Sequence, residues 1–370
     1  MRIVIDARML YWTGVGRYTK ALLDELEAMQ PGYEFIVLVR RADWALWEPK
    51  SAHFTKVECN INPYSLGEQI RLAGILMRLK PDLVHFTAPN APIFYTGARI
   101  VNIHDLTLLD FDTSRGSGVM RWLRSAKRWP FKLVLLRDVR TAKRLITVTQ
   151  YVAGELVRRY GVKPEIISTT LLAADAQVAE PADLARFGLG RRYVFYIGNA
   201  YPYKNIASSI RALPMLGDGL ANVELVIAGK PDTYTVALKE LAEKLGVTAR
   251  VHFVGFVSDG EMVSLYRGAS AYINPSLSEG FGLQGLEAMA QGCPVVAARA
   301  TCLPEVYGEA AEYFDPHNPA DQAAALGRVI GNAGRAQELR SAGQQRLKQF
   351  SWAKMAKETV AAYEAALKVS

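Results

Sequence analysis

Two glutamates, Glu279 and Glu287, stand eight residues apart in the second half of the chain. The residues 278–283, Ser-Glu-Gly-Phe-Gly-Leu, predict a glycine turn that leads from a strand into a helix. The first turn of such a helix offers free N–H groups and a positive dipole end, which favour an anion such as a diphosphate. The two carboxylates, about 10 Å apart along the helix, can accept hydroxyl groups from the hexose and the ribose of a nucleotide sugar. The spacing therefore predicts half of a diphosphate-sugar site.

Two further glycines, Gly14 and Gly16, follow the first predicted strand. Their backbone N–H groups could approach a phosphate or a sugar at a helix N-terminus, and a simple tight turn is the alternative. The segment does not match a dinucleotide fingerprint, because Thr19 replaces the third glycine and the second strand ends in Arg40-Arg41 instead of an acid. An NADP oxidoreductase, the interpretation that Arg40-Arg41 would suggest, is the least favoured one because the glycine fingerprint fails.

His104 directly follows a predicted strand at 99–103. The carboxyl ends of parallel strands form the edge at which open α/β sheets bind ligands, although an isolated histidine is often only structural. Asp110 and Asp112 resemble a metal-binding Asp-x-Asp pair, and we interpret them as a solvated turn. Cys59, Cys293 and Cys302 are an odd number at unrelated spacings, so neither a disulfide framework nor a zinc site is expected.

Short apolar, β-branched runs alternate with amphipathic runs through most of the chain, which predicts an α/β protein with parallel sheets. A length of 370 residues suits two domains. The stretch 173–190, rich in Ala, Asp and Pro, predicts a linker, so we expect domains at 1–172 and 173–350 and a last helix at 351–370. The predicted strands are 2–6, 34–39, 82–86, 99–103 and 145–148 in the first half, and 193–197, 223–227, 251–254, 271–274 and 294–297 in the second.

The composition, with 50% hydrophobic and 22% charged residues, excludes a disordered or low-complexity chain. The sequence contains no apolar run long enough to span a bilayer and begins without a signal-peptide pattern. We expect a cytoplasmic protein.

The net charge of +8 is concentrated in one segment, because residues 115–144 contain ten basic residues and a single acid. Aromatic and aliphatic residues there repeat at helical spacing beside cations, which is typical of a helix lying on an anionic membrane surface. A core helix with a solvated basic face is the alternative. Nucleic acid is not expected as a partner, because no binding motif accompanies the charge. The residues predicted to contact the membrane are Arg121, Trp122, Arg124, Lys127, Arg128 and Trp129.

Several of these segments together resemble the family 4 retaining glycosyltransferases. The resemblance rests on the Glu-x7-Glu pattern of Glu279 and Glu287, the Gly14–Gly16 loop, His104-Asp105, and the segments 196–205, 303–306 and 311–316. It spans nearly the whole chain. It implies the GT-B fold, in which two Rossmann-like domains with parallel sheets face a central cleft and the C-terminal helix crosses back to the first domain. The first domain would bind the acceptor and the second the nucleotide-sugar donor.

The resemblance also implies roles for individual residues. Lys204 is similar to the lysine that contacts the donor phosphate, Glu279 to the residue on the transferred sugar, and Glu287 to the ribose-binding glutamate. Asn199 stands where the family often has an arginine, so Lys204 would have one cation fewer beside it at the diphosphate. The implied catalytic residues are His104, Lys204 and Glu279, and the implied donor-binding residues are Gly16, Gly198, Asn199, Lys204, Glu279, Phe281, Gly282, Leu283 and Glu287.

The function expected from the resemblance is transfer of a hexose, preferably mannose from GDP-mannose, to a lipid-linked sugar or glycan in polysaccharide or glycolipid synthesis. The transfer would be retaining, would need no metal and no cofactor beyond a GDP- or UDP-type donor, and would take place at the inner face of the cytoplasmic membrane. The alternatives are a nucleotide-sugar epimerase, a soluble disaccharide synthase and, less favoured, a non-catalytic binding protein.

Overall fold

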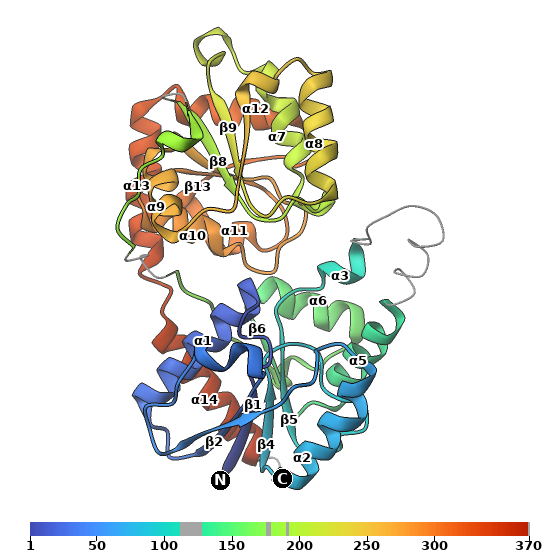
Figure 1. Ribbon diagram of the computed structural model, residues 1–370. Helices are drawn as coiled ribbons and strands as arrows, with labels where there is room; N and C mark the ends of the chain where they lie inside the picture. The colour runs from blue at the N-terminus through green and yellow to red at the C-terminus, as the bar shows by residue number, and fades with distance from the viewer. Residues whose placement is uncertain (112–127, 175–178, 190–191, 369–370) are drawn as a thin grey trace. The chain divides into compact units, whose positions relative to one another are not determined.

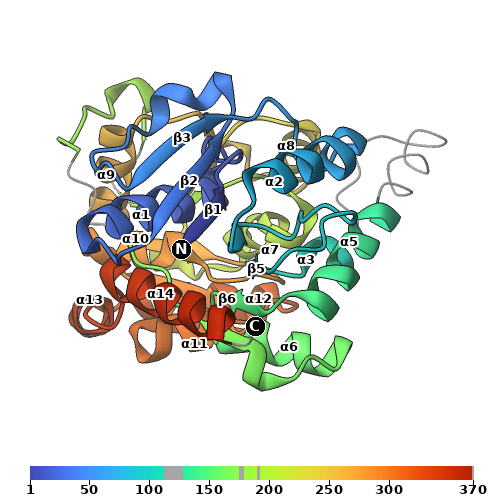
Figure 2. The same cartoon turned by 90° about the horizontal axis from the view of Figure 1, so that it is seen from below.

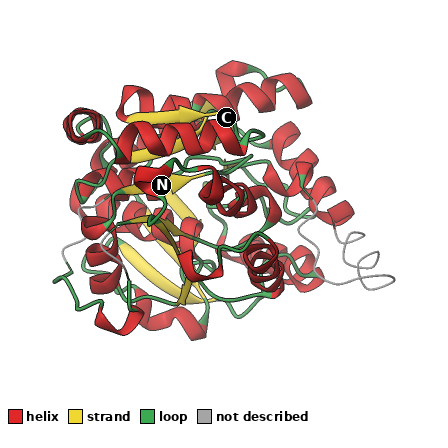
Figure 3. Ribbon diagram, turned by 90° about the horizontal axis from the view of Figure 1, so that it is seen from above, coloured by secondary structure: helices red, strands yellow, loops and turns green. Residues whose placement is uncertain are grey.

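The computed structural model describes residues 1–111, 128–174, 179–189 and 192–368 of the chain (Figure 1). The chain forms two compact units. Unit 1 comprises Met1–Leu172 and Ser351–Ser370, and unit 2 comprises Ala173–Phe350. In both units helices cover the strands of a parallel sheet (Figure 3).

Unit 1 is built on a seven-stranded sheet in the order β3-β2-β1-β4-β5-β6-β7, with parallel pairing throughout. The central strands β1, β4 and β5 are buried along nearly their whole length because helices cover both of their faces. The strands are β1 (Arg2–Asp6), β2 (Glu34–Val39), β3 (Phe54–Glu58), β4 (Leu83–Phe86), β5 (Arg99–Ile103), β6 (Arg144–Thr147) and β7 (Ile167–Thr169).

Alternating side chains of each strand face different helices. On β4, Val84 and Phe86 pack in the core beneath α2, α5 and α6, whereas His85 contacts Tyr363 of α14. The views in Figures 1 and 2 show α1 and α14 together and α2 beside α5. The helices are α1 (Thr13–Met29), α2 (Ala73–Leu79) preceded by a π-helical turn (Glu68–Leu72), α3 (Thr107–Asp110), α5 (Arg128–Thr141), α6 (Gln150–Tyr160) and α14 (Trp352–Lys368).

The last helix, α14, belongs to unit 1, as the sequence predicted. Its N-terminus is capped by Ser351, whose Oγ accepts a hydrogen bond from the N–H of Lys354 at 3.3 Å. Met355 and Tyr363 are completely buried against the sheet. The chain therefore returns to complete the fold of unit 1 after it has built unit 2.

Unit 2 is built on a six-stranded parallel sheet in the order β10-β9-β8-β11-β12-β13. Helix α7 lies between α8 and α12, and α10 packs on α13. The strands are β8 (Tyr193–Ile197), β9 (Glu224–Ala228), β10 (Val251–Gly255), β11 (Ala271–Asn274), β12 (Val295–Ala298) and β13 (Ala311–Phe314). The helices are α7 (Ile206–Ala212), α8 (Thr233–Lys244), α9 (Asp259–Gly268), α10 (Leu283–Ala290), α11 (Leu303–Tyr307), α12 (Pro319–Ile330) and α13 (Ala333–Leu347).

Candidate active site

The glycine turn between β11 and α10 forms as predicted, and its backbone requires glycine at Gly282. This residue has φ +85°, and a Cβ there would lie 2.6 Å from Leu303 Cδ2 and from the Tyr307 hydroxyl. Among the described residues, no side chain caps the helix at Gly282. The N–H of Gly285 donates to the Gly282 carbonyl at 3.1 Å, and the N–H groups before it point out of the start of α10, where the helix dipole is positive.

Tyr307 of α11 holds this turn in place. Its hydroxyl donates a hydrogen bond to the Gly282 carbonyl at 2.5 Å and accepts one from Asn274 Nδ2 at 3.1 Å. Its ring also occupies the space that a Cβ on Gly285 would need, at 2.3 Å. Burial raises the pKa of Tyr307 well above its usual value, so the hydroxyl stays protonated as a donor. Tyr307 was not predicted from the sequence, although the adjoining segment 303–306 is part of the resemblance.

Lys204 and Glu279, both predicted to be catalytic, form an ion pair with 2.7 Å between Nζ and Oε1. Lys204 ends a short turn after β8, and Glu279 lies in the turn before α10. Ser276 Oγ donates a second hydrogen bond to the same carboxylate oxygen at 2.7 Å. Both side chains of the pair are largely buried but remain partly exposed. A cation and a carboxylate are thus placed together at the carboxyl edge of the sheet.

Hydrogen bonds fix the Glu279 turn against the Lys204 turn and against the residues that follow β12. The N–H of Leu277 donates to the Tyr203 carbonyl at 2.8 Å. The N–H of Glu279 donates to Thr301 Oγ1 at 3.1 Å, and the Cys302 thiol donates to the Glu279 carbonyl at 3.2 Å. Neither Thr301 nor Cys302 was predicted from the sequence, because they lie more than twenty residues after the turn.

Gly198 and Asn199 lie just after β8. Gly198 has φ +151°, and its N–H donates to the Ala228 carbonyl at 3.0 Å. Asn199 is exposed, and its side-chain oxygen accepts a hydrogen bond from the N–H of Tyr201 at 3.4 Å. Asn199 therefore adds no cation beside Lys204.

Three more predicted donor residues belong to the α10 region. Glu287 is buried, and its Oε2 lies 3.3 Å from the Tyr266 hydroxyl, which donates to it. The side chain of Phe281 is also buried and meets the ring of Phe350 edge-on, at 5.9 Å between centroids. Phe281 and Leu283 therefore present only their backbone N–H groups as candidate ligand donors.

His104, the predicted acceptor-side residue, follows β5 in unit 1. Its Nε2 lies 2.8 Å from the Thr87 carbonyl. Because a carbonyl can only accept, Nε2 carries the proton and Nδ1 has a free lone pair. Burial lowers the pKa of His104, which favours this neutral form. The partly exposed imidazole can accept a hydrogen bond from a hydroxyl group.

The structure gives Gly16 a packing role, whereas the sequence predicted that it lies in a loop that contacts the donor. Helix α1 begins at Thr13, so both glycines lie in its first turns and not in a loop before it. The N–H of Gly16 donates to the Trp12 carbonyl at 2.8 Å, and a Cβ on Gly16 would lie 2.2 Å from the Leu10 carbonyl oxygen. Gly16 is therefore required for close backbone packing, and its N–H already has an acceptor.

The predicted membrane contacts fall mostly outside the described residues. Arg121, Trp122, Arg124 and Lys127 lie outside the described residues. Asp112 of the Asp-x-Asp pair also lies outside them. Arg128 and Trp129 lie in the first turn of α5. Asp110 forms an ion pair with Arg159 at 2.5 Å. In the described part of the chain, every helix is too short or too polar to cross a membrane.

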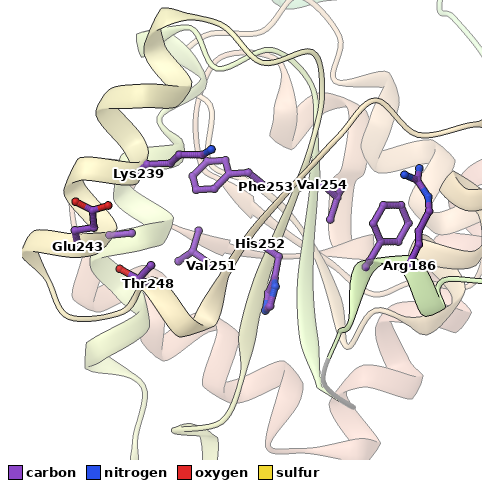
Figure 4. A pocket seen from close by; sticks show the side chains of 10 residues that line it. Arg186, Lys239, Glu243, Thr248, Val251, His252, Phe253 and Val254 are labelled. Atoms are coloured by element: carbon purple, nitrogen blue, oxygen red, sulfur yellow. The ribbon is translucent and has the colours of Figure 1, made fainter.

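A pocket of about 560 Å³ lies at the edge strand β10 of unit 2 (Figure 4). It is lined by α8, β10 and the short turn containing Arg186. None of the residues predicted for catalysis or donor binding lines it. The pocket is therefore separate from the turn that holds Lys204 and Glu279.

Comparison with protein families covers both units. Residues 12–171 match the family described as Glycosyltransferase Family 4, and residues 185–346 match Glycosyl transferases group 1. The chain belongs to the family 4 glycosyltransferases of the GT-B fold. The resemblance inferred from the sequence is thereby confirmed, and the protein is a glycosyltransferase.

Individual relatives of this glycosyltransferase agree with the assignment. It is 26% identical to the O-antigen chain mannosyltransferase B of Escherichia coli over 95% of this chain and 96% of that protein. It is 33% identical to the MMP alpha-(1->4)-mannosyltransferase of Mycolicibacterium hassiacum over 67% of this chain, a match that spans 61% of that relative. The solved structure of Anabaena Alr3699/HepE with UDP and glucose shares the fold, with a TM-score of 0.75 and 17% identity over 99% of this chain and 100% of that one.

Proposed function

We propose that this glycosyltransferase moves a hexose, preferably mannose, from a GDP- or UDP-linked donor to a lipid-linked sugar or glycan, with retention of the anomeric configuration. The ion pair of Lys204 and Glu279 before α10 carries the proposal, because it combines a cation suited to a diphosphate with a carboxylate suited to sugar hydroxyls. Two relatives are named mannosyltransferases, whereas the Anabaena structure contains UDP and glucose. We therefore include both donor bases.

In this mechanism the donor diphosphate binds beside Lys204 and the start of α10, and Glu279 accepts hydroxyl groups of the hexose. Breaking the bond between the anomeric carbon and the phosphate oxygen builds negative charge on the diphosphate. Lys204 and the N–H groups of Phe281, Gly282 and Leu283 stabilise that charge. The chain's own groups thus supply the positive charge, so we propose that neither a divalent metal nor a cofactor takes part.

The acceptor hydroxyl then attacks the anomeric carbon from the face that the diphosphate leaves. A new carbon–oxygen bond replaces the broken one, and the hydroxyl proton passes to the departing phosphate oxygen. Glu287 would bind the ribose, and Nδ1 of neutral His104 would accept a hydrogen bond on the acceptor side. We propose no protein nucleophile.

A lipid-linked acceptor places the enzyme at the inner face of the cytoplasmic membrane. The basic, tryptophan-containing segment with Arg121, Trp122 and Trp129 is our proposed contact with anionic lipid. Binding through this segment would explain the basic character of residues 115–144 without nucleic acid as a partner.

Purified protein, incubated with GDP-mannose or UDP-glucose and lipid-linked acceptors, tests the proposal. We expect transfer with retention, measured by mass spectrometry and by NMR of the anomeric proton. Glu279→Gln and Lys204→Met should each lower kcat/KM by at least about 100-fold. Glu312→Gln, which breaks the surface ion pairs to Arg328 and Arg335, is the matched control. If Glu279→Gln and the control are equally active, the assigned site is wrong, and an epimerised nucleotide sugar or a free disaccharide would favour the alternative enzymes.

A further inference from the structure

A stripe of exposed apolar side chains runs along the helical segment that precedes and includes α2 in unit 1. Leu66, Ile70 and Met77 are 85%, 68% and 58% exposed. Leu72 and Leu76, on the other side of the same segment, are buried against the sheet. The stripe is therefore the solvent-facing side of an element whose inner side already has its core contacts.

The charges that this segment itself exposes are positive. Arg71 and Arg78 are exposed and directly follow Ile70 and Met77 in sequence. In the described range 60–80 the single acid is Glu68, whose carboxylate is buried and accepts hydrogen bonds from Arg8 at 2.5 Å and Asn90 at 2.8 Å. The outward face of the segment thus combines apolar side chains with cations.

Helix α5, next to this segment, also exposes a cation and an apolar side chain. The ring of Phe131 lies 5.9 Å from that of Tyr64, between centroids, and Figure 2 shows α2 and α5 on the same side of the sheet. Lys132 and Leu133 of α5 are exposed. The acid of α5, Asp138, is buried with its Oδ1 3.7 Å from Arg99 Nε.

We propose that this basic-apolar face, formed by Leu66, Ile70, Arg71, Met77, Arg78 and Leu133, docks on an anionic phospholipid bilayer. Apolar side chains at helical spacing with flanking arginines match a helix that lies in the plane of the interface. Charge complementarity points to anionic lipid, because Glu68 and Asp138, the acids of the segment and of α5, are buried, so the charges that these elements expose are positive. The inference deepens the proposed function, since a lipid-linked acceptor lies in such a surface, and it identifies a second contact separate from the tryptophan segment.

Flotation of the full-length protein with vesicles, without donor or acceptor, tests the inference. We expect the protein to float with phosphatidylcholine–phosphatidylglycerol vesicles and to remain behind with phosphatidylcholine alone. The double variant Arg71→Gln/Arg78→Gln should lower partitioning to the anionic vesicles about 25-fold, which is about fivefold for each cation removed. The double variant Leu66→Gln/Ile70→Gln should lower it at least about 10-fold.

The matched control is Val236→Gln/Phe256→Gln in unit 2, whose side chains are 56% and 81% exposed. It should float like the unchanged protein. The inference is overturned if the unchanged protein does not float with anionic vesicles, or if both double variants in unit 1 float as well as the control. It is also overturned if light scattering without vesicles shows that these variants dissociate an oligomer, since the face would then bind a second copy.

A parallel transferase assay with a water-soluble acceptor fragment and no vesicles separates this inference from the proposed function. Activity without flotation would overturn the docking face and leave the proposed transfer intact. Flotation without transfer to any acceptor would overturn the proposed transfer and leave the docking face intact.

Discussion

At the scale of single residues, the turn before α10 depends on a side chain from a different element. The Tyr307 hydroxyl bridges Asn274 and the Gly282 carbonyl, and its ring fills the space left by two glycines. The turn is thus held by hydrogen bonds and by close packing together. Its position controls where the N–H groups proposed to bind the diphosphate point.

Replacing Tyr307 with phenylalanine should separate these two contributions. Tyr307→Phe keeps the ring but removes the buried hydrogen bonds, so we expect the free energy of unfolding to fall by about 1–2 kcal/mol. Transferase activity should fall as well, because the Gly282 carbonyl is released. Tyr313→Phe is the control, since its hydroxyl donates to the Gly308 carbonyl at 2.8 Å outside the turn. An equal loss of activity in both variants would show that Tyr307 acts only through stability.

At the scale of elements, a buried polar chain ties α14 to the sheet of unit 1. His85 of β4 lies with Nδ1 2.7 Å from the Tyr363 hydroxyl and Nε2 2.6 Å from Asn102 Oδ1. Burial lowers the pKa of His85 to about 4. The native state therefore holds this histidine neutral where the unfolded chain would already be protonated.

This shift predicts a specific loss of stability in acid. As the pH falls from about 6.5 toward 4, the unfolded chain binds a proton that native His85 does not, so the free energy of unfolding decreases. A shift of this size corresponds to roughly 3 kcal/mol. His85→Gln should lose that part of the pH dependence, measured by urea unfolding across this range. Asp138, whose pKa burial raises to about 8, is present in both proteins and cancels in the comparison. Identical pH profiles would contradict the assignment.

At the scale of the whole molecule, the two units differ in how the chain builds them. Unit 2 is one continuous segment, 173–350, whereas unit 1 needs the returning helix α14. Met355, Tyr363 and other apolar residues of α14 are buried in unit 1. The units should therefore respond differently when the chain is cut.

We expect residues 173–350, expressed alone, to fold cooperatively, because their sheet and helices form a complete core. If the proposed donor site is correct, the fragment should also bind a nucleoside diphosphate, measured by calorimetry. Residues 1–172 alone should fail to fold stably, since the apolar surface covered by α14 would be exposed. Adding 351–370 through a short linker should restore folding. Stable folding of 1–172 without that helix would disprove the dependence.

The sequence predicted the interior strands well and missed three of the four strands at the sheet edges, whereas the fourth, β10, was predicted. β1, β5 and β8 each contain a short apolar run and are buried along nearly their whole length, because helices cover both of their faces. β3, β7 and β13 were not predicted, and all three are edge strands in their sheets. Edge strands are partly exposed and short, so they depend on pairing with a neighbour more than on a hydrophobic pattern of their own.

The sequence alone determined the local features of the site: the glycine turn, the start of α10, the position of His104 after a strand and the Glu279–Glu287 spacing. These follow from backbone preferences and from periodicity over a few residues, and they sufficed to indicate the family. The tertiary structure decided the pairing of Lys204 with Glu279 and the bracing of the turn by Tyr307. It also decided the packing of Gly16 against Leu10. Such contacts join residues on separate elements, and only the packing of the sheet and its helices brings them within hydrogen-bond distance.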